Sequence, residues 1–269
     1  MRIGVVHVTT EVSSKPYTKM ITETLDRARN EGTELVHRYV GHLRRATDTA
    51  IAYPTLLNKV DIVSEIVALE RDGADAVLVA CSGDPGVAEA RTLVSIPVVG
   101  PMEAAFGLVL GYGWRFGIVT VEDRTWSSNM EQMVNAAGLG SRYAGQRTLH
   151  TPTSVIFTKG FEEPDLVIAD VSARAREMAA AGADSILIGS AGLSTFCSYV
   201  RLAGIDDPEL PIFDVISVGL KFAELRAELS KQVGVPAVSR AGWYARYPLG
   251  DHIRVNRQFG WVPEPEEAK

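Results

Sequence analysis

Length, composition and charge already exclude several classes of protein. The chain has 269 residues, of which 46% are hydrophobic and 22% are charged, so it can bury the core of one large or two medium α/β lobes. Its net charge of −6, without a basic cluster, argues against a nucleic-acid-binding protein. No apolar run approaches the length of a membrane span, and the N-terminal run is too short for a signal peptide. Because two cysteines do not indicate a secreted scaffold, we expect a globular, cytoplasmic protein with neither nucleic-acid nor membrane partners.

The first half of the chain alternates between strand and helix patterns. Runs of β-branched residues predict strands, and apolar residues at helical spacing predict helices. In chain order, strands are predicted over residues 3–8, 33–40, 76–80 and 96–100, and helices over residues 17–30, 55–71, 87–93 and 102–110. The polar stretch 41–53 has few apolar anchors, so we expect a loop that is partly helical.

The second half repeats this order. Strands are predicted over residues 114–120, 185–189 and 210–213, helices over 126–137, 164–181 and 215–229, and a strand with a loop over 140–153. Strands that alternate with helices predict parallel sheets with right-handed crossovers. The sequence therefore predicts an α/β fold of two pseudo-symmetric, doubly wound parallel-sheet lobes, with the active site in the cleft between them.

The predicted lobes divide the chain into three parts. The first lobe comprises residues 1–105, completed by the helix at 215–230, and the second comprises residues 106–214. The tail, residues 231–269, has no counterpart in the repeat and is rich in aromatic residues. We expect these aromatic side chains to pack on the body of the protein or on a partner subunit, which favours a homo-oligomer.

A duplicated motif is central to the functional prediction. Residues 73–83 recur as residues 182–192, with an offset of 109 positions, and Cys81 in the first copy corresponds to Ser190 in the second. In both copies a buried strand ends at this position and turn-forming residues follow. Because ligands of open α/β sheets bind beyond the carboxyl ends of the strands, we expect both side chains in the cleft.

These motifs resemble a known enzyme superfamily. The stretch Val79-Ala-Cys81-Ser-Gly-Asp-Pro-Gly86, residues 96–105 and the repeat at Ser190 are similar to the aspartate/glutamate/hydantoin racemases, most closely the hydantoin and allantoin branch. In that family two cysteines face each other across the substrate. One takes a proton from the carbon next to a carbonyl group, and the other delivers a proton to the opposite face. The resemblance covers roughly residues 1–230 of this doubly wound fold.

The resemblance implies a racemase-type or isomerase-type enzyme that needs no cofactor. Its partner would be a hydantoin-like or amino-acid-like small molecule, and Cys81 would be one acid/base. A thiol suits this chemistry because its pKa lies nearer neutrality than that of an alcohol, and local dipoles can lower it further. Backbone amides near the motif residues can hold the developing enolate oxygen.

Ser190 departs from the family pattern, because such a racemase carries its second cysteine there. A serine hydroxyl is a far weaker acid than a thiol, so symmetrical two-thiol racemisation is not expected of the candidate catalytic pair Cys81 and Ser190. Four interpretations are open: an introduced Cys-to-Ser change, a one-thiol decarboxylase or lyase, a cis–trans isomerase with a nucleophilic Cys81, and a non-catalytic small-molecule binding protein. Cys197 is expected to be a small buried residue of the following helix.

Hydroxyl and backbone groups near the motif strands are the candidates for substrate contacts. Thr9 and Thr10 lie where the hydantoin branch typically has an Asn-Thr pair, so the missing asparagine implies altered contacts. Backbone N–H groups that follow the two motif positions can form anion pockets, and a threonine hydroxyl can bind a substrate oxygen or cap a turn. The expected substrate-binding residues are Thr9, Thr10, Ser82, Gly83, Thr120, Ala191 and Gly192.

Other polar residues near the motifs have simpler structural explanations. We expect His7 to be a hydrogen-bonded structural residue, Asp84 to stabilise its turn, and Asp75 and Asp184 to mark the turns into the motif strands. The five histidines lack metal-ligand spacing and no nucleotide-binding fingerprint occurs, so we predict neither a metal nor a nucleotide site.

Overall fold

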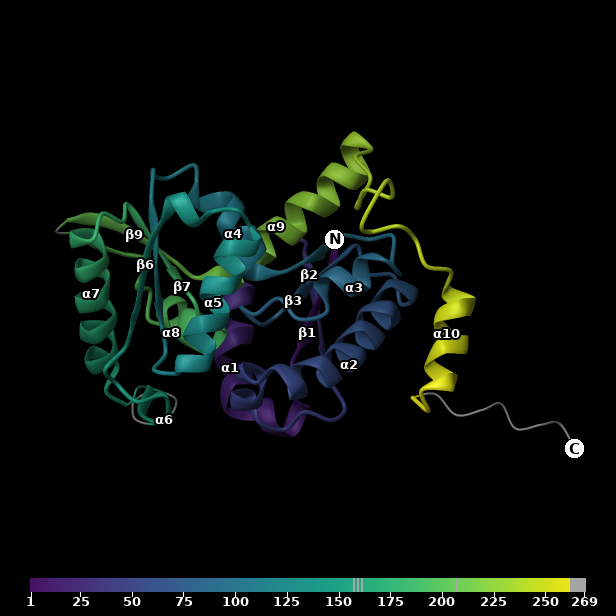
Figure 1. The fold of residues 1–269 in the computed structure, drawn as a ribbon, viewed down its shortest axis with the longest axis horizontal. Helices are drawn as coiled ribbons and strands as arrows, with labels where there is room; N and C mark the ends of the chain where they lie inside the picture. Colours follow the sequence, from purple (N-terminus) through teal and green to yellow (C-terminus); the bar gives the residue numbers. More distant parts are fainter. Residues whose placement is uncertain (157, 159, 161, 207, 262–269) are drawn as a thin grey trace, which may run out of the picture.

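The computed structural model of the protein has two sheets that lie next to each other (Figure 1). It describes residues 1–156, 158, 160, 162–206 and 208–261. Helices connect the strands of each sheet, and all but one of the strand pairs are parallel, so the predicted fold class is confirmed. No helix in this described part of the chain is long and apolar enough to cross a membrane.

The first sheet consists of four parallel strands in the order β2-β1-β3-β4. The strands are β1 (Arg2–His7), β2 (Glu34–Tyr39), β3 (Ala76–Val79) and β4 (Val98–Val99). The helices that cover this sheet are α1 (Glu11–Ala28), α2 (Ala52–Arg71), α3 (Val87–Arg91) and α9 (Val215–Glu228). Helices α2 and α3 pack on the face of Val6, Val77 and Val79. Helices α1 and α9 pack on the other face, which includes Ile3 and Leu78. Burial of both faces explains the continuous apolar runs of these strands.

The second sheet has the order β6-β5-β7-β9-β8, in which β8 and β9 are antiparallel. Its strands are β5 (Phe116–Thr120), β6 (Tyr143–Thr148), β7 (Ser185–Ile188), β8 (Gly204–Asp206) and β9 (Glu209–Phe213). Its helices are α4 (Pro101–Val109), α5 (Arg124–Ala136), α7 (Pro164–Ala180) and α8 (Ala191–Tyr199). A short 3-10 turn, η2 (Gly140–Arg142), precedes β6.

The register of the sheets follows the repeat in the sequence. Ile3 lies opposite Ala76 in the first sheet, and Phe116 lies opposite Ser185 in the second. Asp75 accepts a hydrogen bond from the backbone N–H of Arg2, as Asp184 does from that of Arg115, each at 2.8 Å. These paired aspartates tie the start of one strand to the turn before the next. Cys81 and Ser190 therefore follow equivalent strands by the same number of residues.

Two helices are exchanged between the sheets. Helix α4 follows β4 of the first sheet, but Met102 and Phe106 pack with Phe116 and Ile118 of the second. Helix α9 follows β9 of the second sheet, but Ile216 and other residues pack on the first. The two exchanged helices also contact each other along their lengths. Burial of apolar surface thus joins the two lobes, which we define as each sheet with the helices packed on it.

The tail begins with a π-helical turn, η4 (Leu229–Val233), and ends in α10 (Leu249–Gln258). Between them it contacts the first lobe. Arg240 donates to the backbone oxygens of Arg91 at 2.6 Å and Val94 at 2.5 Å, and the N–H of Tyr247 donates to the oxygen of Thr92 at 2.8 Å. The side chains of Trp243 and Phe259 remain exposed.

Several elements differ from the sequence prediction in their bounds or were not predicted. Helix α1 begins at Glu11 rather than at the predicted start near Tyr17, because the polar residues before Tyr17 form its first turns. The stretch 41–53 contains a 3-10 helix, η1 (Ala46–Ala50), and the stretch 140–153 runs on into a short helix, α6 (Thr153–Ile156). Strand β8 and helix α10 carry no clear period in the sequence and were missed.

We expect the exchanged helices to tolerate the replacement of a glycine by alanine only where the added Cβ atom has room. A Cβ atom added at Gly219 of α9 would lie 2.7 Å from Leu78 and 3.0 Å from the Cα of Pro101, whereas one at Gly107 of α4 would lie 3.8 Å from Phe222. Gly219→Ala should lower the free energy of unfolding by about 1–2 kcal/mol, because overpacking outweighs the gain in helix propensity. Gly107→Ala, the matched control, should raise it by up to about 1 kcal/mol. Urea denaturation measures both, and equal effects would contradict close packing at Gly219.

Candidate active site

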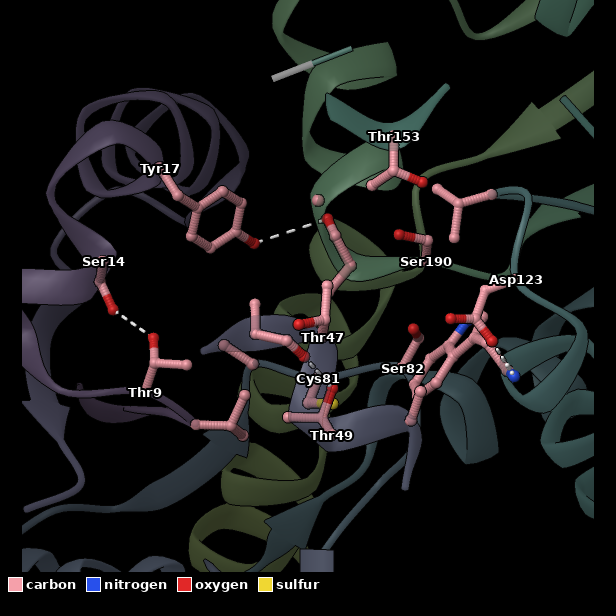
Figure 2. A pocket seen from close by; sticks show the side chains of 18 of the residues that line it. Thr9, Ser14, Tyr17, Thr47, Thr49, Cys81, Ser82, Asp123, Thr153 and Ser190 are labelled. Atoms are coloured by element: carbon pink, nitrogen blue, oxygen red, sulfur yellow. Dashed lines mark hydrogen bonds between the residues drawn. The ribbon is translucent and has the colours of Figure 1, made fainter. Parts of the chain in front are cut away.

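A cavity of about 570 Å³ lies where the carboxyl ends of the two sheets face each other. Residues that follow β1, β3, β5 and β7 line it, together with residues of α1, η1 and α6 (Figure 2). The lining comprises residues 7–9, 13, 14, 17, 46, 47, 49, 50, 80–82, 121–123, 126, 152–154 and 190–192. This volume is typical of small-molecule sites, and the position is the one at which open α/β sheets bind ligands.

Cys81 lines the cavity two residues after the end of β3. The chain turns there because the N–H of Asp84 donates to the carbonyl oxygen of Cys81 at 3.0 Å. The cysteine is 5% exposed. Burial, reinforced by the nearby Asp84, raises the pKa of the Cys81 thiol to about 12, although the N–H of Gly83 opposes this shift. Cys81 is therefore a neutral thiol at neutral pH, because burial outweighs the local dipoles that can lower a thiol pKa.

Ser190 lines the second-lobe side of the cavity, two residues after the end of β7. It is the N-cap residue of α8, and its Oγ accepts a long hydrogen bond of 3.5 Å from the N–H of Leu193. Serine is a favoured N-cap residue, so a serine at this position has a structural role that the duplicated motif alone does not reveal. Because Oγ accepts from the backbone, its O–H remains available as a donor toward the cavity.

Hydrogen bonds between the lobes, together with one from Trp126 within the second lobe, fix the cavity walls. The carbonyl oxygen of Gly189 accepts from Ser82 Oγ at 3.2 Å and from Trp126 Nε1 at 2.6 Å. The Tyr17 hydroxyl of α1 lies 2.9 Å from Thr195 Oγ1 of α8, and Thr195 in turn donates to the oxygen of Ala191 at 2.8 Å. Both networks end at residues adjacent to Ser190. They therefore hold the second motif position in place from the first lobe.

The structure places the two threonines after β1 differently. Thr9 lines the cavity, and its Oγ1 lies 2.7 Å from Ser14 Oγ. Thr10 is the residue before α1, and its hydroxyl donates to Ser13 Oγ at 2.9 Å instead. Of this pair, Thr9 alone belongs to the lining that the structure describes.

Gly83 and Thr120 also lie outside the described cavity lining, whereas Ser82, Ala191 and Gly192 belong to it. A Cβ atom at Gly83 would lie 3.1 Å from a ring carbon of Trp126, so glycine allows the turn after β3 to approach α5. Thr120 is fully buried, and its Oγ1 has no hydrogen-bond partner within the described residues. Residues 121–123, immediately beyond Thr120, line the cavity instead.

Several lining residues were missed by sequence reasoning. Ser14 and Tyr17 lie three positions apart on α1 and both line the cavity, a spacing that places side chains on one helix face. Thr47 and Thr49 come from the stretch that was predicted to be a loop, and Thr153 from α6. Their hydroxyl groups are visible in the sequence as possible substrate contacts. No local pattern in these stretches, however, shows that the residues meet at one cavity.

His7, which belongs to the cavity lining, pairs with a second histidine, His37. His7 Nε2 lies 2.8 Å from His37 Nδ1, and the His7 ring stacks on Tyr39 with centroids 4.4 Å apart. Only 2% of His7 is exposed. Burial, and to a lesser extent the neighbouring His37, lowers the pKa of His7 to about 3. His7 is thus neutral at neutral pH, and the predicted hydrogen-bonded role agrees with this geometry.

The cavity is rich in hydroxyl groups, and its charged groups are acidic. Its described lining includes Glu122 and Asp123 but no lysine or arginine. Asp123 also caps α5, where its Oδ1 accepts from the N–H of Trp126 at 2.9 Å. Across the described residues, no group of three or more His, Cys, Asp or Glu side chains lies close enough to hold a metal ion. Polar recognition in this cavity therefore depends on hydroxyl groups, backbone groups, the His7 ring and two carboxylates.

Sequence comparison points to one family. The profile of the family described as Asp/Glu/Hydantoin racemase matches residues 3–223. The chain is 36% identical to the hydantoin racemase of Pseudomonas sp. (strain NS671) over 104 residues, which are 39% of this chain and 41% of that protein. The matched segment thus spans less than half the length of this relative.

Solved structures show the same fold. The allantoin racemase from Pseudomonas fluorescens has a TM-score of 0.73 and 22% identity, with all of both chains covered. The allantoin racemase from Klebsiella pneumoniae has a TM-score of 0.70 and 23% identity, with 92% of this chain and 94% of that chain covered. At 22–23% identity, these comparisons show a common fold.

We expect the alkylation of Cys81 to be slow at neutral pH. With a thiol pKa of about 12, the thiolate fraction at pH 7 is about a thousandfold below that of an ordinary cysteine. The iodoacetamide rate, measured by mass spectrometry, should rise about tenfold per pH unit between pH 7 and pH 10. Cys81→Ala gives the background from Cys197. Rapid, pH-independent labelling near pH 7 would show that the cavity stabilises a thiolate.

We expect the buried histidine pair to make the fold sensitive to acid. The folded-state pKa of His7 lies below its unfolded value of 6.5, so the unfolded state binds protons first as the pH falls. This contribution to stability is complete above about pH 6.5 and is lost from there down to about pH 3, by up to about 1.4 kcal/mol per pH unit. His7→Asn should flatten that part of the urea stability profile, and the exposed His150→Asn should not. Identical profiles for both variants would contradict the prediction.

Proposed function

Because this chain belongs to the Asp/Glu/hydantoin racemase family, as its motifs predicted, we propose that it moves a proton at a carbon next to a carbonyl group without a cofactor. The supporting observation is that Cys81 and Ser190 follow equivalent strands of the two sheets and line one cavity. Cys81 is the proposed catalytic thiol. Cys197, which is fully buried in α8 and lies outside the described lining, takes no part.

The chemistry of the cavity favours an uncharged substrate. A malonate would bring two negative charges to a lining that already has Glu122 and Asp123, without a described lysine or arginine to compensate them. A cyclic amide of the hydantoin type carries neutral carbonyl and N–H groups, which hydroxyl and backbone groups can satisfy. The hydantoin racemase of Pseudomonas sp. (strain NS671), a partial sequence match, is named for this class of substrate.

In this proposal Cys81 is the proton donor, and it acts after the α-proton has left the other face of the substrate. A neutral thiol protonates the carbanion-like carbon: the S–H bond breaks, a C–H bond forms and a thiolate remains. The N–H of Gly83 opposes the rise in thiol pKa, so it also stabilises that thiolate. In the opposite direction the thiolate takes the proton back from the same face of the substrate.

Ser190 and Asp123 act on the other face. The free O–H of Ser190 donates a hydrogen bond to the substrate carbonyl oxygen, whose negative charge increases as the α-proton leaves. The Asp123 carboxylate, which lines the second-lobe side of the cavity, takes that proton as general base. A carboxylate thus replaces the second thiol of a two-cysteine racemase, and the site remains able to invert the carbon.

A one-thiol enzyme that protonates a single face is the second candidate. It is favoured by the observation that Cys81 is the one thiol in the described cavity lining. Such an enzyme would release carbon dioxide or another leaving group and would protonate the resulting enolate from Cys81. It would not need Asp123.

Exchange of the α-hydrogen with deuterated solvent tests the proposal. We expect the protein to exchange and racemise a chiral 5-substituted hydantoin above the uncatalysed rate, as measured by NMR and chiral chromatography. Cys81→Ala and Asp123→Asn should each lower the rate by at least about a hundredfold, because each removes one proton-transfer group. Asn is as good an N-cap as Asp, so Asp123→Asn retains α5 while it removes the base.

Ser190→Cys and the double variant Cys81→Ala/Ser190→Cys complete the design. Exchange by Ser190→Cys alone would mean that Ser190 is a disabled acid/base and that Asp123 does not replace it. Exchange without racemisation that survives Asp123→Asn would favour the one-face enzyme. Inactivity of every variant toward hydantoins, allantoin and substituted malonates would leave a small-molecule binding protein.

A further inference from the structure

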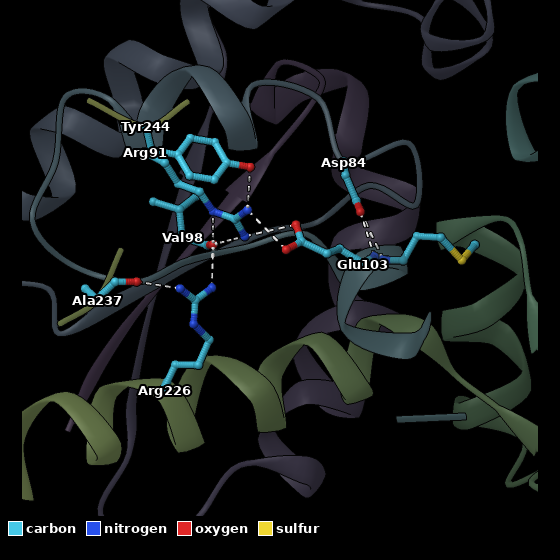
Figure 3. A network of polar contacts seen from close by, with 8 residues as sticks. Asp84, Arg91, Val98, Glu103, Arg226, Ala237 and Tyr244 are labelled. Atoms are coloured by element: carbon cyan, nitrogen blue, oxygen red, sulfur yellow. Dashed lines mark hydrogen bonds and ion pairs between the residues drawn. The ribbon is translucent and has the colours of Figure 1, made fainter. Parts of the chain in front are cut away.

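A second cavity of about 500 Å³ lies between the tail and the first lobe, and it shares no described lining residue with the first. Its walls come from α3, the β4–α4 junction, α9 and residues 235–239 and 244 of the tail. Its charged lining consists of Arg91, Arg226 and Glu103 (Figure 3). Two guanidinium groups and one carboxylate give this set a single net positive charge.

Arg91 uses all of its hydrogen-bonding capacity within the protein. Its Nη1 donates to Glu103 Oε1 at 3.1 Å and to the Tyr244 hydroxyl oxygen at 3.3 Å. Its Nη2 lies 2.9 Å from Glu103 Oε2 and donates to the carbonyl oxygen of Val98 at 2.8 Å, which Nε also contacts at 3.2 Å. A guanidinium group has five N–H donors, so none is left over. Both oxygens of Glu103 are occupied by this bidentate pair.

Arg226 has fewer hydrogen-bond partners than Arg91 and no direct ion pair among the described residues. Its Nη1 donates to the carbonyl oxygen of Val98 at 3.2 Å, and its Nη2 donates to that of Ala237 at 2.6 Å. Three N–H groups remain, and no described residue accepts a hydrogen bond from them. The carboxylate of Glu103 acts on Arg226 only through space. Burial, together with the positive charge of Arg91, lowers the pKa of Arg226, and the opposing effects of Glu103 and Tyr244 are smaller. A negative charge in the cavity would relieve this electrostatic cost.

Tyr244 offers a further donor. Its oxygen accepts from Arg91, so its O–H is free of any described acceptor. The remaining walls are largely apolar and include Val99, Phe222 and Leu229. The volume lies in the range of small-molecule sites, about 300–1,000 Å³. An occupant that suits these walls has a carboxylate for the unused donors and an apolar body.

We infer that this second cavity binds a small carboxylate with an apolar body, held by Arg226 and Tyr244. A planar carboxylate matches the fork of a guanidinium group, which favours it over a spherical anion. A hydrogen bond also connects this second cavity to the turn that follows Cys81. The backbone N–H of Glu103 donates to Asp84 Oδ2 at 2.8 Å, and Asp84 belongs to the turn after Cys81.

Benzoate and its neutral isostere benzamide test the site by isothermal titration calorimetry on the full chain. We expect benzoate to bind at one site and benzamide to bind at least tenfold more weakly. Arg226→Gln should weaken benzoate binding at least tenfold. Arg254→Gln, which removes one positive charge from the exposed part of α10, is the matched control and should leave it unchanged.

A second variant covers the case that Arg226→Gln loosens the tail. Ala237→Leu narrows the cavity from the tail side and leaves the carbonyl group that Arg226 contacts, so it should also weaken benzoate binding. Unweakened benzoate binding to both variants, or equal binding of benzamide, would overturn the proposal. Removal of residues 262–269, which include three glutamates, should leave the affinity unchanged. Tighter binding after that removal would assign the cavity to the chain's own acidic end instead.

Discussion

The exchange of α4 and α9 between the two sheets is the constraint on which the rest of the structure depends. Each helix follows a strand of one sheet and buries its apolar face on the other. The two helices meet where Gly219 lies close to Leu78 and Pro101, so the lobes share a close-packed contact. The carboxyl ends of β3 and β7 consequently face each other across one cavity, and neither lobe can form that cavity alone.

Burial then governs the proton chemistry of this cavity. It keeps Cys81 protonated and His7 neutral, so the described lining holds few charges apart from its two carboxylates. In such surroundings a hydrogen bond or a charge from the substrate has a larger effect than in water. The tie between Ser82, Trp126 and the carbonyl group of Gly189 makes the walls part of the same network as the second motif position.

The order of the strands and helices and the positions of the two motif residues were predictable, because they depend on local sequence patterns. The duplicated motif predicted that Cys81 and Ser190 occupy equivalent positions, and the register of β1–β3 and β5–β7 repeats in the same way. The residues of α1, η1 and α6 were not predicted as site residues. Ser14 precedes the predicted start of its helix and Tyr17 lies at that start, and Thr47 belongs to a polar stretch without a clear hydrophobic period. Their place at the cavity depends on contacts between segments far apart in the sequence, which local patterns do not encode.

The sequence by itself determined the alternation of strands and helices, the duplication, the family and the position of one thiol at a strand end. These follow from short-range periodicity and from motifs whose chemistry is local. The tertiary structure alone decided that Thr9 rather than Thr10 lines the cavity, that Ser190 caps a helix, and that Cys81 is a neutral thiol. It also placed Arg226 next to the tail, where none of the described carboxylates forms a direct ion pair with it. Burial, side-chain direction and the pairing of distant charges are properties of the packed chain, because each depends on what the fold brings next to a residue.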